Sequence, residues 1–462
     1  MAILTLKTIT ERLEAVIQGR RARSFDRGID LPEHKHYTAD KPTEAIPCPQ
    51  TVVVPLNQHT GEPVEPIVSV GDRVTIGQKI GDLEEKWSSP VHAGVSGVVT
   101  HIEPRPFGDG TELPSVVIRA DREQNVPELT PRGDWESLDR DRILAVIKDN
   151  GIVGMAGAGF PTHINLEVRT KIPTLIVNGA ECEPFLTSDH RIMVERADAV
   201  IGGARIIARV IGADHCYIGI ENNKPDAIEV LTEKTRNLPE FSVVPVAVKY
   251  PQGYKKTLLR AITGKEPPLG GRSADVGCIV RNVSTTAAIY EAVVLNKPLF
   301  ERVVTVSGLH EIARPGNYRV PIGTPLRHIL EHVGVDLEAL GGYKVVRGGP
   351  MTGTAVDTLE APVVKAATGI LVMPPAAIQP AYERVNPCIR CSACVKHCPI
   401  GLYPNEISQL VEAGTPEAAE RLHISECCEC AICSYVCPAY RQVTDLVMEG
   451  KAILKERRRR SR

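Results

Sequence analysis

A cysteine pattern that occurs twice near the C-terminus constrains this chain more than any other feature. Each copy has four cysteines with the spacing C-x2-C-x2-C-x3-C and ends in proline. This spacing is typical of ligands to a 4Fe-4S cluster, in which three thiolates lie on one short loop. Zinc sites normally join two C-x2-C pairs by a long linker, so the run argues against zinc. The copies are Cys388, Cys391, Cys394 and Cys398, and Cys427, Cys430, Cys433 and Cys437.

The fourth ligand of each cluster must come from outside its loop, because one short loop cannot enclose a cubane. In proteins with two such runs, the last cysteine of each run binds the cluster of the other run. We therefore expect two clusters with exchanged ligands. The first is assigned to Cys388, Cys391, Cys394 and Cys437, and the second to Cys427, Cys430, Cys433 and Cys398.

The remaining cysteines and the N-terminus indicate a reducing compartment. Charged residues interrupt the first 16 residues, MAILTLKTITERLEAV, where an export signal needs an apolar core. In a cytoplasmic protein, 13 cysteines favour metal or redox chemistry over a disulfide framework. Cys428 is out of register and is expected to be a packed spectator. Cys48, Cys216 and Cys278 lie in or beside apolar runs, which predicts buried, inert thiols.

Charge and hydropathy exclude two classes of protein. The net charge of −2 provides no long-range attraction to nucleic acid. No stretch approaches the apolar length that spans a bilayer, so we expect no transmembrane segment. The basic residues from 451 to 462 are expected to be a solvated terminus, with contact to anionic lipid as the alternative.

The length of 462 residues requires several domains. Strands expected at 174–178 and 216–220 alternate with helices, which predicts a parallel, Rossmann-like sheet. One of these helices is expected to carry both Ile192 and Ile206, and another to begin near Pro225. The predicted units are a polar extension (1–40), a small all-β domain (41–125), the α/β domain (138–300), a second β-rich domain (301–375), the cysteine domain (376–446) and a basic tail (447–462).

A glycine-rich loop is the first candidate ligand site in the α/β domain. Gly154, Gly157 and Gly159 permit tight turns and close approach of the backbone to an anion. A dinucleotide fingerprint read from Gly157 would need glycine at position 162, where Thr162 stands. The loop by itself therefore leaves a structural turn and a phosphate site equally open.

A polar strand end is the second candidate. The sequence NGAECEP at 178–184 directly follows a buried strand, where α/β folds place ligand-binding groups. Asn178, Glu181 and Glu183 could hydrogen-bond to a ring or a ribityl chain. Turn and helix-cap roles for the same side chains remain the alternative.

Together with the cysteines, a series of motifs resembles one known family, the C subunit of the Rnf (also Rsx) electron-transport complex. The resemblance runs from about Phe25 to Leu446, and so many motifs in one order make it specific. The motifs are GI at 28–29, QHTGEP at 58–63, VGDRVTIGQKIG at 70–81, GAGFPTH at 157–163, NGAECEP at 178–184, DHR at 189–191, KYPQG at 249–253, PGNYRVPIGTP at 315–325 and GGPMTG at 348–353.

The resemblance implies an architecture and a set of cofactors. It implies a barrel-sandwich (lipoyl-like) domain, a Rossmann-like domain for FMN and NADH similar to the flavoprotein subunit of complex I, an SLBB-like β-grasp domain and a ferredoxin-like domain with two 4Fe-4S clusters. FMN would be held without a covalent bond. Met155 and Ala156 depart from the more basic, glycine-rich start of the complex I loop, so the hydride-donor pocket is expected to differ.

The resemblance also implies roles for single residues of the α/β domain. The glycines of the loop would face flavin phosphate or the nicotinamide nucleotide. Both carboxylates of the strand end are the candidate catalytic residues and, with the neighbouring amide, would line the isoalloxazine site. The implied cofactor-binding residues are Gly154, Gly157, Gly159, Asn178, Glu181, Glu183, Asn282 and Thr285.

The function implied by the family is electron exchange between NADH, FMN and the two clusters, in a ferredoxin:NAD oxidoreductase at the cytoplasmic side of the membrane. Partner subunits, including membrane subunits and a ferredoxin-like subunit, would translocate Na⁺ or H⁺. One alternative is a soluble flavin and iron-sulfur reductase similar to cobalamin reductase, in which the barrel-sandwich domain follows the clusters. The other is a carrier or scaffold subunit without flavin.

Overall fold

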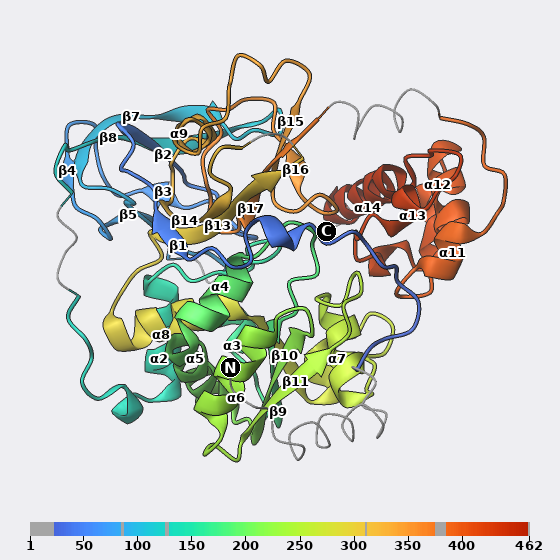
Figure 1. The fold of residues 1–462 in the computed structure, drawn as a ribbon, viewed down its shortest axis with the longest axis horizontal. Coiled ribbons are helices and arrows are strands. Elements are labelled where there is room, and N and C mark those ends of the chain that lie inside the picture. The colour runs from blue at the N-terminus through green and yellow to red at the C-terminus, as the bar shows by residue number, and fades with distance from the viewer. Residues whose placement is uncertain (1–22, 85–86, 125–128, 310–311, 375–384, 461–462) are drawn as a thin grey trace, which may run out of the picture.

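The structure is a computed structural model that describes residues 23–84, 87–124, 129–309, 312–374 and 385–460. Within these residues the chain forms four packed units (Figure 1). The α/β unit lies at the bottom of the view, two β units lie above it, and the cysteine unit lies at the right. Residues 1–22 of the expected extension and residues 376–384 of the expected cysteine domain are outside the described part.

The α/β unit contains a four-stranded sheet in the order β11-β10-β9-β12, and every neighbouring pair is parallel. The expected parallel sheet is therefore confirmed. Helices α2, α5 and α8 cover one apolar face and α7 covers the other. The elements are α2 (Arg140–Asp149), α3 (Thr162–Leu166), β9 (Thr174–Gly179), α4 (Ser188–Glu195), α5 (Ala197–Ile211), β10 (His215–Glu221), α6 (Pro225–Thr235), β11 (Phe241–Val246), α7 (Lys255–Thr263), β12 (Cys278–Asn282) and α8 (Val283–Leu295).

Two details of the α/β unit test the helix predictions. Helix α6 begins at Pro225, as expected, because proline fixes a helical φ at a position that needs no N–H donor. The single helix expected to carry both Ile192 and Ile206 is wrong. The chain bends at Arg196 (φ −131°, ψ 33°) and forms two helices, α4 and α5. The Arg196 guanidinium forms an ion pair with Glu291 of α8, a contact that local sequence cannot predict.

The first β unit is a sandwich of two small antiparallel sheets around an apolar core that includes Val52, Ile80 and Ile118. Alternating buried residues in its strands agree with the period-2 pattern of the sequence. One sheet has the order β2-β8-β7-β4 and the other β3-β5-β6. The strands are β2 (Thr51–Pro55), β3 (Glu65–Pro66), β4 (Arg73–Val74), β5 (Lys79–Asp82), β6 (Val91–His92), β7 (Gly97–Pro106) and β8 (Glu112–Ala120).

The second β unit is a six-stranded mixed sheet with one helix. Its order is β1-β14-β13-β17-β15-β16, so β1 from the N-terminal part of the chain pairs with β14 rather than joining the sandwich. The elements are β1 (Thr43–Ala45), β13 (Glu301–Gly308), β14 (Gly316–Pro321), α9 (Leu326–His332), β15 (Lys344–Arg347), β16 (Thr354–Ala355) and β17 (Gly369–Met373).

The cysteine unit is helical and extends further than the sequence suggested. Residues 447–460, expected as a tail, are the C-terminal part of α14, and Leu454 is buried. Arg458 pairs with Glu420 at 2.7 Å, so this segment packs back on its own domain. The elements are α11 (Ala393–His397), α12 (Pro404–Glu412), η5 (Pro416–Leu422), η6 (Ile424–Glu426), α13 (Ile432–Tyr435) and α14 (Val443–Arg460), where η denotes a 3-10 helix.

Candidate functional site

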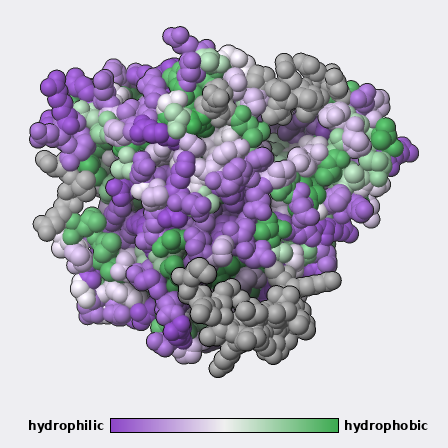
Figure 2. All heavy atoms as spheres, in the orientation of Figure 1, coloured by the Kyte–Doolittle hydropathy of each residue, from purple (hydrophilic) through white to green (hydrophobic). Residues whose placement is uncertain are grey.

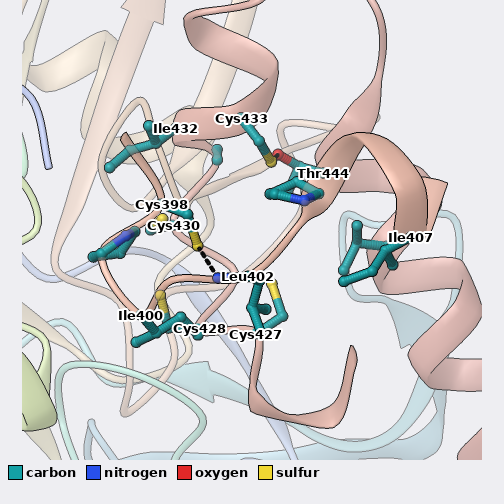
Figure 3. Close-up of a pocket in the computed structure, with 14 residues that line it drawn as sticks. Cys398, Ile400, Leu402, Ile407, Cys427, Cys428, Cys430, Ile432, Cys433 and Thr444 are labelled. Atoms are coloured by element: carbon teal, nitrogen blue, oxygen red, sulfur yellow. Dashed lines mark hydrogen bonds between the residues drawn. The ribbon is translucent and has the colours of Figure 1, made fainter. Parts of the chain in front are cut away.

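Two cavities in the cysteine unit are each lined by four of the predicted ligands. The backbone brings Cys437 to the loop of the first run and Cys398 to the loop of the second run, so each cavity takes its fourth thiol from the other run. One cavity is lined by Cys388, Cys391, Cys394 and Cys437. The other is lined by Cys398, Cys427, Cys430 and Cys433 (Figure 3).

The four thiols of each set line a cavity and do not converge on one point. Within the described part of the chain, no group of three or more His, Cys, Asp or Glu side chains is arranged to hold a single metal ion. Four sulfurs around a cavity suit a cubane, whose irons lie apart from one another. The donor set and the cavities therefore fit two 4Fe-4S clusters better than two zinc ions.

Backbone donors already point at the sulfurs of the cavity in Figure 3. The Leu402 N–H donates to Cys398 Sγ at 3.3 Å, and the Glu429 N–H donates to Cys427 Sγ at 3.4 Å. The Thr444 hydroxyl lies 3.2 Å from Cys433 Sγ. Hydrogen bonds to sulfur stabilise negative charge on a cluster and adjust its reduction potential.

The cysteines outside the two runs have different surroundings from one another. Cys428 lines the cavity of the second run and hydrogen-bonds to Cys430, which raises the pKa of the Cys428 thiol far above its ordinary value. Cys216 and Cys278 are buried, as expected, and burial raises the pKa of both thiols. Cys48 is exposed, so the expectation of a buried thiol is wrong there, because its segment lies at the surface between β1 and β2.

The predicted residues of the α/β unit meet at the carboxyl edge of the parallel sheet. Asn282, the last residue of β12, lies directly opposite Asn178 of β9 in the register of the two strands. The Asn178 amide donates to the Gly253 carbonyl at 2.8 Å, which holds the turn after β11 beside it. Asn282 accepts from the N–H groups of Ser284 and Thr285 and so caps α8.

Glu181 caps a helix. Its carboxylate accepts from the backbone N–H groups of Asp189, at 2.7 Å, and His190, at 3.1 Å, in the first turn of α4. Burial and the nearby Asp189 carboxylate raise the pKa of Glu181 to about 6, although Lys35 and Lys224 oppose the rise. The geometry thus gives Glu181 the cap role that sequence reasoning left as the alternative.

Glu183 binds a loop of the second β unit. Its carboxylate accepts from the Met351 N–H at 3.1 Å and from the Thr352 hydroxyl at 2.5 Å. A side chain on Gly349 would overlap Glu183 Oε2 at 2.2 Å, so the GGPMTG sequence needs glycine there. Burial raises the pKa of Glu183. This carboxylate therefore ties the strand end to a neighbouring domain.

The glycine-rich loop is fixed from both sides. The Met155 N–H donates to the Thr285 hydroxyl at 2.9 Å, and Arg302 donates to the Met155 carbonyl at 2.9 Å. Gly159 has φ +63° and packs on the sandwich, where a Cβ would lie 2.9 Å from the Gln58 carbonyl. Gly157 has φ +147°, is exposed and faces open space. Of the three glycines, Gly157 is thus the one with a position open to a ligand.

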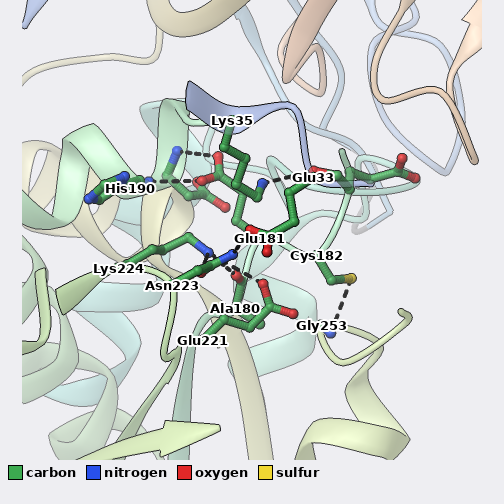
Figure 4. A network of polar contacts seen from close by, with 12 residues as sticks. Glu33, Lys35, Ala180, Glu181, Cys182, His190, Glu221, Asn223, Lys224 and Gly253 are labelled. Atoms are coloured by element: carbon green, nitrogen blue, oxygen red, sulfur yellow. Dashed lines mark hydrogen bonds and ion pairs between the residues drawn. The ribbon is translucent and has the colours of Figure 1, made fainter. Parts of the chain in front are cut away.

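A buried network of charges at the same edge escaped sequence reasoning (Figure 4). Lys224 is 1 % exposed, and its ammonium donates to the Ala180 carbonyl at 2.7 Å and approaches Glu221 Oε2 at 3.4 Å. Lys35 is 8 % exposed and donates to two carbonyls of the chain segment after β9. Sequence reasoning had no signal for the carbonyl partners of these lysines, because Ala180 lies 44 residues from Lys224 and the partners of Lys35 lie about 150 residues away.

The second cysteine run lies against the α/β unit. Cys430 and Ile432 pack in one apolar cluster with Tyr250, Ile29 and Cys182, and Cys182 belongs to the NGAECEP strand end. Lys256 of α7 also pairs with Glu426 at 2.6 Å. The cavity lined by Cys398, Cys427, Cys430 and Cys433 is therefore the one next to the carboxyl edge of the sheet.

One orphaned side chain at this edge suits a flavin. Gln252 is fully buried, and neither atom of its amide has a hydrogen-bond partner among the described residues. Its neighbour Gly253 contacts both Asn178 and Cys182 of the strand end. An unpaired buried amide is costly, and a ring edge that offers both donors and acceptors would satisfy it. The residues present therefore fit a bound flavin.

Comparison with known families assigns a domain type to each unit. Residues 23–123 match the RnfC barrel sandwich hybrid domain, and residues 147–291 match the Nuo51 FMN-binding domain. Residues 303–355 match the SLBB domain, and residues 387–440 match a 4Fe-4S dicluster domain. The chain thus contains an FMN-binding domain and a 4Fe-4S dicluster domain, and the expected four-part architecture is confirmed.

Relatives are similar over most of the chain. The C subunit of the ion-translocating oxidoreductase complex of Rhodobacter capsulatus is 40% identical over 400 residues, which cover 86% of this chain and 76% of the relative. The C subunit of the Na(+)-translocating ferredoxin:NAD(+) oxidoreductase complex of Acetobacterium woodii is 38% identical, over 84% of this chain and 87% of the relative. The proton-translocating counterpart of Clostridium ljungdahlii is 39% identical, over 84% of each. None of the described helices is long and apolar enough to cross a membrane.

Proposed function

Because the chain belongs to the family formed by the C subunits of ion-translocating oxidoreductase (Rnf) complexes, we propose that it exchanges electrons between NADH, FMN and two 4Fe-4S clusters in a ferredoxin:NAD oxidoreductase complex. The observation that carries this proposal is the contact between the two redox domains. Cys430, a candidate cluster ligand, and Cys182, at the edge of the FMN-binding domain, pack against one apolar cluster formed by Ile29, Tyr250 and Ile432. The relatives belong to complexes named for Na⁺ and proton translocation, and we assign that translocation to partner subunits.

FMN, when bound, accepts a hydride and releases single electrons. The part of this chain is to bind and orient it at the carboxyl edge of β9 and β12. Gln252 offers an unpaired amide there, Asn178 holds Gly253 in place, and Gly157 gives open backbone. Asn282 and Thr285 order the start of α8 and the glycine-rich loop. Glu181 and Glu183 keep the strand end in place through their contacts to α4 and to the GGPMTG loop, and we assign them this role toward the flavin.

The two cysteine sets would act in order. Cys398, Cys427, Cys430 and Cys433 would hold the cluster that takes electrons from the flavin side, because Cys430 packs against that side. Cys388, Cys391, Cys394 and Cys437 would hold the outer cluster. Exposed apolar side chains next to this outer set support an exit to a partner. They include Ile389 (67 % exposed) and Tyr440 (41 % exposed).

The same surface supports a peripheral position in a membrane complex. Green, apolar side chains gather at the right of Figure 2, where Figure 1 draws α11 and α12 of the cysteine unit. Apolar residues beside a redox centre suit a protein partner that must approach closely. We propose that a ferredoxin-like subunit or a membrane subunit docks there, on the cytoplasmic side.

The soluble reductase remains the second candidate function, and domain order argues against it. In cobalamin-reductase-like proteins the barrel-sandwich domain follows the clusters, whereas here it occupies residues 23–123 and the dicluster domain residues 387–440. The third candidate, a carrier without flavin, predicts no FMN in the purified protein. The orphaned amide of Gln252 favours a bound ligand.

The test is the cofactor content of the anaerobically purified chain. Two complete ligand sets predict about eight irons and eight acid-labile sulfides per chain, together with one FMN. NADH should then bleach the cluster absorbance. Four irons, stoichiometric zinc, or clusters that NADH leaves oxidised while FMN is present would each contradict the proposed function.

A further inference from the structure

The N-terminal segment before β1, whose role the sequence does not reveal, lies across the carboxyl edge of the parallel sheet (Figure 1). Arg23 forms a bridge to Val246 at the end of β11, and Ile29 forms a bridge to Tyr250. Further along, β1 pairs with β14 of the second β unit. The segment therefore passes directly over the place where the candidate flavin residues meet.

Lys35 in this segment reaches the strand end that carries both carboxylates. Its ammonium donates to the Glu183 carbonyl at 2.9 Å and to the Leu186 carbonyl at 2.6 Å. The lysine is 8 % exposed, so both hydrogen bonds lie in a poorly solvated place, where charged donors bind carbonyls strongly. Lys35 thus fixes two points of the backbone that directly follows Glu181.

Three neighbouring contacts join the same two segments. The Phe185 N–H donates to the Glu33 carbonyl at 2.8 Å, and the ring of His34 stacks on Phe185 with centroids 4.6 Å apart. The hydroxyls of Thr38 and Thr187 share a hydrogen bond of 2.7 Å. These contacts form a continuous seam, so the position of Lys35 is set by its surroundings rather than by one flexible side chain.

Lys35 lies in a network of charged side chains that includes Glu181, Glu221 and Lys224 (Figure 4). Burial lowers the pKa of Lys35, Lys224 adds to this effect, and Glu181, Glu221 and Cys182 oppose it. Among the charged groups that face Glu181, Lys35 and Lys224 lower its pKa and Asp189 raises it. The ammonium from the N-terminal segment, together with that of Lys224, thus favours ionised Glu181.

We propose that Lys35 is a positioning residue of the flavin site, which holds the backbone of 181–186 in place and sets its positive charge against Glu181. The N-terminal segment before β1 is then part of the redox site. This inference rests on the proposed function, because it assumes that FMN binds at the carboxyl edge of the sheet.

The test compares Lys35→Met with Lys41→Met. Lys41 lies in the same segment and also donates to a carbonyl, that of Pro315 at 2.7 Å, but it is exposed. FMN affinity of the flavin-depleted protein is measured by fluorescence between pH 5 and 8, and iron content reports folding. Loss of one charged anchor predicts FMN affinity weaker by about tenfold in Lys35→Met and unchanged in Lys41→Met.

The pH dependence separates positioning from a merely structural role. The wild-type affinity should change near the pKa of Glu181, about 6. Without the opposing charge of Lys35 this transition should move to higher pH, by about one unit. Glu181→Gln should abolish the transition, and this variant keeps the test valid if Lys35→Met fails to fold.

The outcomes are distinguishable from a failure of the proposed function. If the wild-type protein binds no FMN, the proposed function fails together with this inference. If the wild-type protein binds FMN and Lys35→Met matches Lys41→Met in affinity and in pH profile, only the inference is overturned. A transition that persists unchanged in Glu181→Gln would also overturn it, because another group would then be responsible.

Discussion

Replacing Lys224 by methionine should destabilise the protein far more than its single positive charge would suggest. The Lys224 ammonium is 1 % exposed and donates to Ala180 at 2.7 Å and to Asn223 at 2.8 Å. It also faces Glu221, which is 1 % exposed, at 3.4 Å. The variant would leave the Glu221 carboxylate without its neighbouring cation. Breaking a buried pair in this way costs about 3–5 kcal/mol.

The assay is a thermal melt with a matched control on the same helix. A loss of 1 kcal/mol lowers the melting temperature of a domain of 150–250 residues by about 2–4 °C, so we expect a drop of at least about 6 °C. Lys234 lies at the other end of α6 and pairs with Asp198 at 2.7 Å, with side chains 40 % and 81 % exposed. Lys234→Met should cost less than about 1 kcal/mol.

The pH dependence has a definite sign. Burial raises the pKa of Glu221 in the folded protein, and Lys224 opposes this rise. In the folded variant, Glu221 therefore keeps its proton at pH values above 4.5, where Glu221 of the unfolded chain has already released it. The free energy of unfolding consequently falls as the pH rises above 4.5. The deficit of Lys224→Met should shrink toward pH 5. Equal melting temperatures for the two lysine variants, or a deficit that grows in acid, would refute the reasoning.

Three further predictions concern the redox machinery. Cys437→Ser should remove about half of the iron and spare the EPR signal of the cluster next to the flavin, whereas Cys428→Ser should keep about eight irons. If Cys437→Ser instead removed the signal of the cluster next to the flavin, exchanged ligands would be excluded. Glu183→Gln should slow NADH-driven cluster bleaching more than it lowers the melting temperature, and unchanged turnover at normal flavin content would remove its role. Leu454→Ala should lower the free energy of unfolding by about 2–5 kcal/mol and speed iron release, because Leu454 is buried. Truncation at residue 455 should lower it little, because the pair that is lost, Arg458–Glu420, lies at the surface. Equal effects of the two changes would indicate that the whole segment is a solvated tail.

The local chemistry of the sequence determined much of this protein. Three cysteines spaced three residues apart lie on one short loop and can bind one cluster together, so the spacing alone predicted both ligand loops. Strands β9 and β10 were predicted from apolar runs, and the start of α6 from Pro225, because these signals act through neighbouring residues. The strand end at 178–184 was predicted as a ligand site because α/β folds place ligand-binding groups there, whereas Asn282 was named only from the family resemblance, and the sheet register then placed it opposite Asn178.

The tertiary structure decided what those residues contact. The sequence left Glu181 between a ligand contact and a helix cap, and only the return of α4 to the strand end shows the cap. It gave no sign of Lys35, whose partners Glu183 and Leu186 lie about 150 residues away along the chain. Hydrogen bonds and charge pairs act over a few ångströms in space, whatever the separation in sequence, so a buried lysine and an exposed one look alike until the fold has brought their neighbours together.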